Sequence, residues 1–255
     1  MKDLLVSWLV AIPLVVGLGH FSRTSASLGP LDSHGPAAAP LTDRARLLAE
    51  IQSLRNQLKT REQEYLSPDA EDRSTFAKLL TAPDTGLIRL LPRPQSESQS
   101  PLSVRGGGAY YSFTRLTHDY GYGSDISLEN GYFSVGFAGA DFGFLAALGD
   151  VPLESISADT FGVQFLADLR IPVRTSEARV QQRLSGNGVE QDGIVYKRTV
   201  AAVPGITYVV RSVDFDSSDV LVGFRVVRKD GDGSLILLWR MLRQYPGPTL
   251  IRDEQ

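Results

Sequence analysis

Residues 125–137 have the sequence DISLENGYFSVGF, in which two runs that alternate apolar and polar residues flank Asn130-Gly131. An Asn-Gly pair between such runs is a strong hairpin signal, because both positions of the tight turn need a positive φ. The stretch therefore predicts two antiparallel strands joined by a two-residue turn.

Further strand-like runs, rich in β-branched and aromatic residues, extend to the C-terminal region. They cover residues 86–92, 194–200, 206–211, 220–227 and 235–239, and Gly-containing turn signals separate the later ones. Short helices are expected at residues 68–80 and 152–156. The predicted fold is mainly antiparallel β with minor helix, arranged as a sandwich or a partly open barrel.

The chain begins with an apolar segment in which no charge interrupts residues 4–19. This length lies between a signal-peptide core of ~7–15 residues and a membrane-spanning helix of ~20. Lys2 before the segment favours a start that stays inside while the remainder crosses. We expect residues 1–23 to be a signal peptide or membrane anchor, and the protein to be extracytoplasmic, membrane-anchored or secreted, in the cell envelope or periplasm if bacterial.

A change of composition after residue 23 divides the rest of the chain. Residues 24–40 are rich in Pro, Ala and Ser and predict a flexible tether. Residues 67–255 form the predicted β-rich globular domain, in which residues 92–101 are expected to be an exposed loop or linker.

Between the tether and this domain, residues 41–66 predict a coiled-coil helix. The seam consists of apolar side chains in steps of four, three, four and seven residues, with Arg61 at the intervening seam position: Leu47, Ile51, Leu54, Leu58 and Tyr65. Because an isolated helix of this length is marginal in water, it is expected to pack against something. A homodimer and packing on its own globular domain are both open.

Composition excludes several functional classes. The net charge of −3 gives no broad basic surface, so no nucleic-acid partner is expected. The absence of cysteine excludes disulfides, thiolate metal sites and a cysteine nucleophile. No cofactor and no metal are expected.

No known catalytic motif is complete. Residues 230–234 resemble the start of a calcium loop, but Leu235 and Met241 stand where Gly and Glu are needed. Asp141-Phe142-Gly143 matches the kinase magnesium motif without the glycine-rich loop or strand lysine that a kinase requires. His118 is the only histidine of the predicted domain, and no serine elbow accompanies it. No catalytic residue is assigned.

Residues 106–149 are unusual, with ten of the 24 glycines and, between positions 110 and 132, five of the nine tyrosines. Glycine lets backbone approach a ligand closely, and tyrosine offers a flat apolar face with a polar tip. The ligand-binding candidates of this region are Tyr110, Arg115, His118, Asp119, Tyr120 and Asp125. Alternatively, the glycines serve bulges and bends of a curved sheet.

The sequence favours a non-enzymatic envelope protein whose β-rich domain acts as an interaction or scaffold module. One alternative is a hydrolase of envelope glycans that uses carboxylates such as Asp119, Asp125, Glu129 and Asp141. Another is a module that binds a small molecule or glycan. A small outer-membrane barrel is disfavoured because Lys197, Arg211 and Arg225 lie inside strand-like runs.

Overall fold

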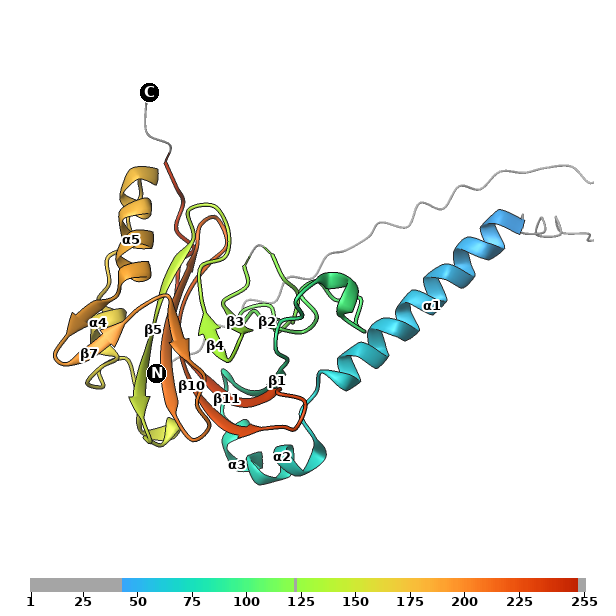
Figure 1. Ribbon diagram of the computed structural model, residues 1–255, viewed down its shortest axis with the longest axis horizontal. Coiled ribbons are helices and arrows are strands. Elements are labelled where there is room, and N and C mark those ends of the chain that lie inside the picture. Colours follow the sequence, from blue (N-terminus) through green and yellow to red (C-terminus); the bar gives the residue numbers. More distant parts are fainter. Residues whose placement is uncertain (1–42, 122, 252–255) are drawn as a thin grey trace, which may run out of the picture. The chain divides into compact units, whose positions relative to one another are not determined.

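The computed structural model describes residues 43–121 and 123–251 of the chain, drawn in Figure 1. Its helices are α1 (Asp43–Tyr65), α2 (Ala70–Thr75), α3 (Ala77–Leu80), α4 (Gln164–Ala167) and α5 (Thr175–Asn187). Its strands are β1 (Thr85–Leu90), β2 (Tyr110–Tyr111), β3 (Ile126–Glu129), β4 (Tyr132–Ser134), β5 (Phe142–Gly149), β6 (Val189–Gln191), β7 (Ile194–Tyr196), β8 (Thr199–Ala201), β9 (Thr207–Asp214), β10 (Ser218–Lys229) and β11 (Leu235–Tyr245). The 3₁₀ turns are η1 (Glu97–Gln99) and η2 (Leu153–Ser155).

The strands form antiparallel sheets. The larger sheet has the order β1-β11-β10-β9-β5, the smaller one has the order β2-β3-β4-β8, and β6 and β7 pair separately. Strands β9, β10 and β11 are neighbours both in sequence and in space, so local hairpins build the centre of the larger sheet. The predicted fold class, mainly antiparallel β with minor helix, is confirmed.

The hairpin at residues 125–137 forms as predicted. Glu129 of β3 lies opposite Tyr132 of β4. The two turn residues between them, Asn130 and Gly131, have φ angles of 50° and 79°. Positive φ at both positions is the geometry for which the Asn-Gly pair is favoured.

One hydrophobic core is shared by the two sheets. It includes Leu128 and Phe133 from the smaller sheet and Val210 and Phe224 from the larger. The ring of Phe133 meets the ring of Phe224 edge-on, with centroids 5.0 Å apart. Such edge-to-face pairs add to the stabilisation from burial alone. The alternation of side chains along β3 and β4 thus places their apolar residues against the larger sheet.

Backbone hydrogen bonds also link the edges of the two sheets. Just after β1, the amide of Leu91 donates to the carbonyl of Gly108, which precedes β2, at 3.1 Å. At the other edge, Leu145 of β5 and Lys197, which precedes β8, exchange two hydrogen bonds of 2.8 and 3.0 Å. These contacts tie the small sheet to both outer strands of the large one.

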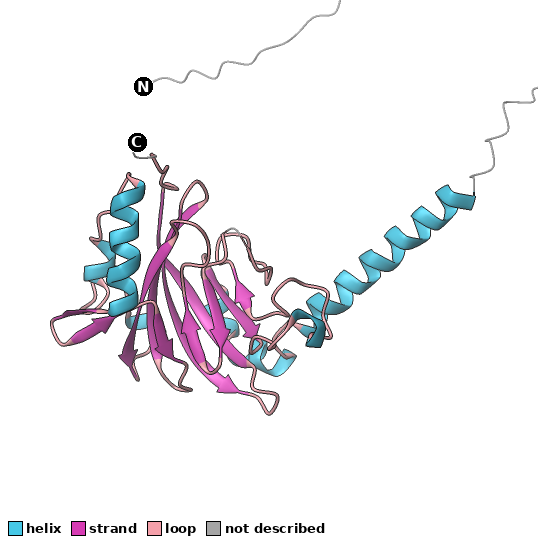
Figure 2. Ribbon diagram, turned by 45° about the horizontal axis from the view of Figure 1, so that its top comes forward, coloured by secondary structure: helices cyan, strands magenta, loops and turns pink. Residues whose placement is uncertain are grey.

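Helices cover the other face of the larger sheet. Figure 1 and Figure 2 show α4 and α5 beside β5, on the side away from β3 and β4. Leu166 of α4 and Ala178 of α5 belong to a second core with Phe144 and Val209. Phe76, between α2 and α3, and Leu79 and Leu80 of α3 pack against a third, smaller cluster that includes Leu238 of β11.

The buried guanidinium of Arg211 links the centre of the large sheet to α4. Arg211 of β9, only 1% exposed, donates from Nε and Nη2 to the carboxylate of Asp219 on β10 at 2.6 and 2.8 Å. Its Nη1 donates to the carbonyls of Leu166 and Ala167 at 2.8 and 3.3 Å. The guanidinium lies 3.5 Å from the ring centroid of Tyr245. A desolvated charge is tolerated when it is paired and hydrogen-bonded in this way.

The structure differs from the prediction in several elements. Strand β5 and helix α5 are not predicted by the sequence patterns. The single helix expected at residues 68–80 is two helices, because Phe76, with φ −99° and ψ 12°, leaves helical geometry and ends α2. The short helix expected at residues 152–156 is the 3₁₀ turn η2.

The predicted helix at residues 41–66 corresponds to α1. The apolar segment 1–23 and the tether 24–40 lie outside the described residues. Within residues 43–121 and 123–251, no helix combines the length and the apolar character needed to cross a membrane.

The substitution Asp219→Ala should lower the free energy of unfolding by about 3–5 kcal/mol, because it leaves the buried charge of Arg211 without its partner. Urea denaturation of the variant and the wild type measures the difference. The control is Asp150→Ala, which breaks the pair with Arg225; the side chain of Asp150 is 81% exposed. Such a surface pair contributes about 0–1 kcal/mol, so similar losses in both variants would contradict the role given to Arg211.

Candidate functional site

Two of the predicted ligand-binding residues, Tyr110 and Tyr120, meet in a small cavity that we call the polar pocket. It has a volume of about 350 Å³ and is lined by Arg93, Tyr110, Tyr120, Glu129, Ser134, Phe137, Arg198 and Thr199. Strands β2, β3 and β4 of the small sheet supply Tyr110, Glu129 and Ser134. The cavity therefore lies on the face of the small sheet that is turned away from the shared core.

Glu129 organises the wall of the polar pocket. Its Oε1 accepts hydrogen bonds from the Tyr110 hydroxyl at 2.7 Å and from Nη1 of Arg93 at 3.0 Å. The hydroxyl of Ser127 approaches the same oxygen at 3.4 Å. Burial, and then the hydrogen bond and charge of Glu129, raise the pKa of Tyr110 above its usual value. Tyr110 is therefore protonated at neutral pH and acts as a donor.

Aromatic rings form the other wall. The rings of Tyr110 and Tyr120 have centroids 4.6 Å apart, and Phe137 meets Tyr110 edge-on at 5.1 Å. The guanidinium of Arg105 lies 5.4 Å from the centroid of Tyr120. Arg198 is held by the carbonyls of Val135 and Gly136 rather than by a carboxylate, with bonds of 3.0 and 2.5 Å. Flat rings beside hydroxyl and guanidinium groups suit a small polar ligand.

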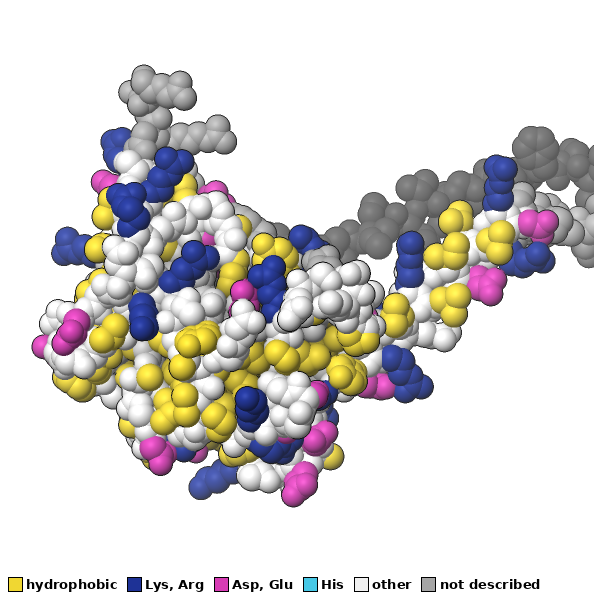
Figure 3. All heavy atoms as spheres, viewed as in Figure 1, with side chains coloured by type: hydrophobic (Ala, Val, Ile, Leu, Met, Phe, Trp, Pro, Cys, Tyr) yellow, Lys and Arg dark blue, Asp and Glu magenta, His cyan; other side chains and the backbone are white. Residues whose placement is uncertain are grey.

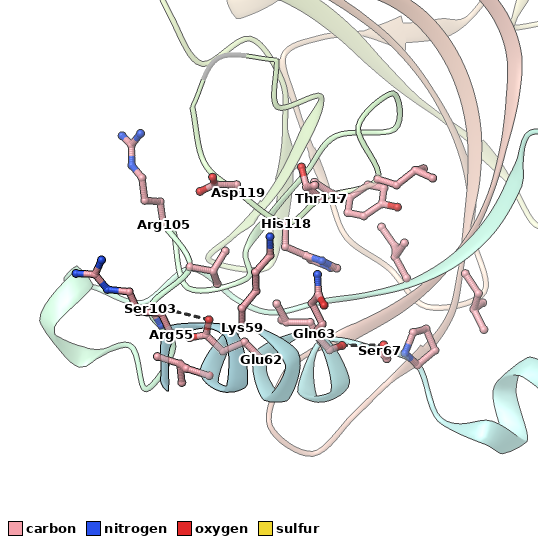
Figure 4. A pocket seen from close by; sticks show the side chains of 18 residues that line it. Arg55, Lys59, Glu62, Gln63, Ser67, Ser103, Arg105, Thr117, His118 and Asp119 are labelled. Carbon is pink, nitrogen blue, oxygen red and sulfur yellow. Dashed lines mark hydrogen bonds between the residues drawn. The ribbon is translucent and has the colours of Figure 1, made fainter. Parts of the chain in front are cut away.

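His118 and Asp119 lie instead at a second cavity, which we call the α1 groove. It has a volume of about 800 Å³ and runs between the C-terminal half of α1, strand β1 and the segments 103–105 and 116–119. Figure 4 shows the side chains that line it. Glu62 of α1 attaches the helix to one of these segments, because its carboxylate accepts hydrogen bonds from the amide and the hydroxyl of Ser103.

His118 has a structural role in this groove. Its Nε2 donates to the carbonyl of Arg89 at 2.9 Å, and its ring packs against Tyr111 with centroids 5.0 Å apart. Burial lowers the pKa of His118 to about 4, although the bond to Arg89 acts in the opposite direction. The imidazole is therefore neutral at pH 7 and connects the segment around it to β1.

The remaining two candidates line neither cavity. Asp125 is fully buried; its Oδ2 accepts the amide of Phe113 at 2.7 Å, while its Oδ1 has no hydrogen-bond partner in the part of the chain that the structure describes. Arg115 is exposed, with its guanidinium near Gly123: a Cβ at that glycine would stand 3.0 Å from Nη2 of Arg115. Gly123 also has φ +83°, so another side chain there would be both strained and crowded.

Three buried aspartates gather near the start of β3, the start of β5 and the end of β9. Burial raises the pKa of Asp125 to about 6, although the neighbouring hydroxyls of Ser112 and Ser212 act in the opposite direction. Burial likewise raises the pKa of Asp141 to about 6, and the carboxylate also accepts the amide of Phe215 at 3.0 Å.

Asp214 is the most strongly perturbed member of this aspartate cluster. Burial, and then the charges of Asp125 and Asp141, raise the pKa of Asp214 to about 8, while Ser218 and Arg115 act in the opposite direction. None of the three aspartates lines the polar pocket or the α1 groove.

A glycosidase needs a pair of carboxylates on either side of a bound sugar. Among the described residues, Glu129 is the only carboxylate that lines the polar pocket. Within residues 43–121 and 123–251, no group of three or more histidine or acidic side chains is placed to hold a metal ion. Comparisons of the chain with protein-family models, with curated proteins and with solved structures found no match.

The aspartate cluster predicts a pH dependence of stability. A carboxyl whose pKa is raised on folding stabilises the fold most below its ordinary pKa of about 4, and this contribution is lost as the pH rises through the folded-state value. The values of about 6 and about 8 therefore place the loss between pH 4 and pH 8. Scanning calorimetry should show the melting temperature falling by about 5 °C or more between pH 5 and pH 9.

The matched variant is Asp214→Asn, which keeps the shape of the side chain and removes its titration. Its melting temperature should change less between the same two pH values. A variant with the same pH dependence as the wild type would show that Asp214 is not the titrating group.

Proposed function

We propose that the chain is a non-enzymatic interaction or scaffold protein of the cell envelope, held at a membrane by residues 1–23. Helix α1, which we call the stalk, pairs with the same helix of a second copy. The β-rich domain presents binding surfaces to partners. The sheets joined at both edges fit the partly open barrel among the folds expected from the sequence. The observation that carries the proposal is the exposed apolar stripe of α1.

This stripe is the predicted coiled-coil seam. The exposed fractions are 52% for Leu47, 44% for Ile51, 57% for Leu54 and 48% for Leu58. Figure 3 shows hydrophobic side chains, in yellow, at several places along α1. The compact unit Ala49–Gln255, which contains most of α1, leaves Ile51 and Leu54 exposed, while Leu58 is partly exposed and also lines the α1 groove. This exposure favours pairing with another helix over packing on the chain's own domain.

Charges beside the seam favour a second, parallel copy as the partner. With Ile51 and Leu58 at heptad position a and Leu54 at d, Glu50 takes position g and Arg55 takes position e. In a parallel pair, position g of one helix meets the following position e of the other. Glu50 of one copy would thus face Arg55 of the other, twice by symmetry. A parallel pair also places the two N-terminal segments on the same side.

The pairing can be tested by disulfide cross-linking, since the wild-type chain has no cysteine. Full-length protein with Leu54→Cys, purified in detergent and mildly oxidised, should run as a covalent dimer on non-reducing gels, because the two seam positions face each other. The control is Asn56→Cys on the outer face of the helix, which should remain mostly monomeric. Equal cross-linking of both variants, or none of Leu54→Cys, would refute the parallel pair.

A second candidate function is binding of a small glycan or similar polar ligand in the polar pocket. The specific observation is that Tyr110 and Tyr120 stand side by side, next to Arg93 and Glu129. A sugar ring stacks on a tyrosine face while its hydroxyl groups bond to neighbouring polar groups. A hydrolase of envelope glycans is less well supported, because the cavity has a single lining carboxylate.

The substitution Tyr120→Ala should remove retention on immobilised envelope glycans, because the aromatic wall is lost. Its melting temperature should stay within a few degrees of the wild type, since Tyr120 is only half-buried. Affinity electrophoresis in glycan-containing gels measures the binding. The matched control is Tyr132→Ala, an exposed tyrosine of the same sheet outside the pocket. Equal retention of wild type and Tyr120→Ala would count against a glycan site in this pocket.

A further inference from the structure

Strand β1 is an edge strand of the larger sheet, and among the described strands it pairs with β11 alone. In antiparallel pairs, residues whose amide and carbonyl face the partner alternate with residues whose groups face away. The amide of Met241 donates to the carbonyl of Asp84 at 2.8 Å, so the even-numbered positions bond to β11. The amides and carbonyls of Leu87 and Arg89 therefore point outward.

On the outward edge of β1, the backbone groups at one end are hydrogen-bonded, whereas those of Leu87 are not bonded to any described residue. Beyond it, the Arg89 carbonyl accepts a bond from His118 and the Leu91 amide bonds to Gly108. No residue within 43–121 or 123–251 bonds to the amide or carbonyl of Leu87. Leu87 also lines the α1 groove. A short unpaired strand edge, of the kind that proteins usually protect, thus faces a cavity.

The floor of the α1 groove is apolar. Leu66, Ile88 and Tyr111 line it and are 4%, 4% and 5% exposed. At its mouth, Leu116 is 60% exposed and has φ 54°. A leucine in the left-handed region is strained, and such strain is typically kept at binding sites. The bond from the Leu116 amide to the Ser112 carbonyl, 2.8 Å long, holds it there.

The rim of the groove carries an excess of positive charge at one end. Arg55, Lys59 and Arg105 line it together with the carboxylates of Glu62 and Asp119. Glu62 already accepts two hydrogen bonds from Ser103. Figure 4 shows Arg55 and Arg105 toward one end of the cavity and Lys59 directed toward His118. An acidic group of a partner would be attracted to this end.

We propose that the α1 groove binds an extended segment of a partner protein, which adds a short strand to the free edge of β1. One or two apolar side chains of that segment contact Leu66 and Tyr111, and an acidic residue lies near Lys59 and Arg105. Strand addition draws affinity from main-chain hydrogen bonds and specificity from alternate side chains. This inference rests on the proposed role as an interaction domain and names its partner class.

The test uses a phage library of random dodecapeptides, selected on the full-length protein in detergent micelles. We expect enriched peptides with alternating apolar residues and Asp or Glu toward one end. The best peptide is then synthesised in two forms, with N-methyl groups on alternate residues of either parity. One form should bind at least tenfold more weakly and the other nearly normally, because only one set of amides faces β1. Equal binding of both forms, or no enrichment, would overturn strand addition.

Variants of the protein test the same contact from the other side. Leu87→Pro removes the outward amide at an edge position that tolerates proline, and should weaken binding at least tenfold. Leu87→Ala keeps the amide and should lose much less. Should Leu87→Pro not fold, as judged by circular dichroism, the two N-methylated peptides decide alone.

The charged rim has its own matched pair. Lys59→Glu should weaken binding of the acidic peptide, because Lys59 lines the groove, whereas Lys78→Glu, away from the groove, should not. An equal effect of both substitutions would exclude the charged rim from recognition.

The cross-linking of Leu54→Cys provides an independent readout. Peptide binding without cross-linking would refute the pairing of two α1 helices and would support the α1 groove as a binding site. Cross-linking without any selected peptide would support the pairing of two α1 helices and would refute strand addition at the α1 groove.

Discussion

The fold depends on placing one guanidinium in its interior without leaving any of its charge unpaired. Arg211 stands in the central part of the large sheet, where it is only 1% exposed, and its neighbours come from three other elements: β10, α4 and β11. The ion pair with Asp219 fixes β9 against β10. The bonds to the α4 carbonyls also hold the end of this short helix, where the Ala167 carbonyl accepts a further bond from the Tyr245 hydroxyl at 2.9 Å. Helix α4 is thereby fixed to the sheet by directional hydrogen bonds as well as by apolar contacts.

Three residues further along β9, Asp214 faces the opposite situation. Its nearest charged neighbours include two other carboxyls, Asp125 and Asp141, and like charges without water favour the protonated forms. Strand β9 therefore carries a paired charge at Arg211, near its middle, and a carboxyl with a raised pKa at its end, Asp214. Because Asp125 immediately precedes β3 and Asp141 precedes β5, the uncompensated cluster lies where strands of both sheets begin. Alkaline conditions are thus expected to loosen the contact between the sheets before they affect the ion pair of Arg211.

The sequence predicts those parts of the fold whose local chemistry and tertiary environment agree. The β3–β4 hairpin is recognised because Asn130-Gly131 meets the turn geometry, and β9 to β11 because β-branched residues fill them. Strand β5 has the sequence FGFLAALG, without β-branched residues. It is a strand because it pairs with β9 from Phe142 to Gly149. Its small residues allow neighbours to approach closely, since a Cβ at Gly143 would overlap Val135 and the Arg211 carbonyl. Helix α5 is mostly polar and buries only Ala178 and Ser185, so its apolar periodicity is weak.

The candidate site is predicted less completely, because its members come together only through strand pairing. Tyr110 and Tyr120 are found from composition. Their partner Glu129 is named from the sequence only among the carboxylates of the hydrolase alternative, because nothing in the hairpin pattern shows that it contacts the tyrosines. Arg93 lies in the Pro- and Ser-rich stretch expected to be a loop, and it reaches the pocket only because that stretch crosses the end of β3, where its amide bonds to the carbonyl of Leu128 at 2.8 Å.

Helix α1 has two different faces, and their combination gives the molecule its proposed mode of action. Glu62 and Leu66 attach the last turns of α1 to the domain, through Ser103 and the floor of the α1 groove. Ile51 and Leu54 remain exposed earlier in the helix. Because the last turns are attached by hydrogen bonds as well as by packing, the seam has a defined direction relative to the groove. Pairing of two helices would then set the spacing and orientation of two grooves at once. A partner with two suitable segments would bind more tightly, because its second segment would bind at a high effective concentration once the first is bound.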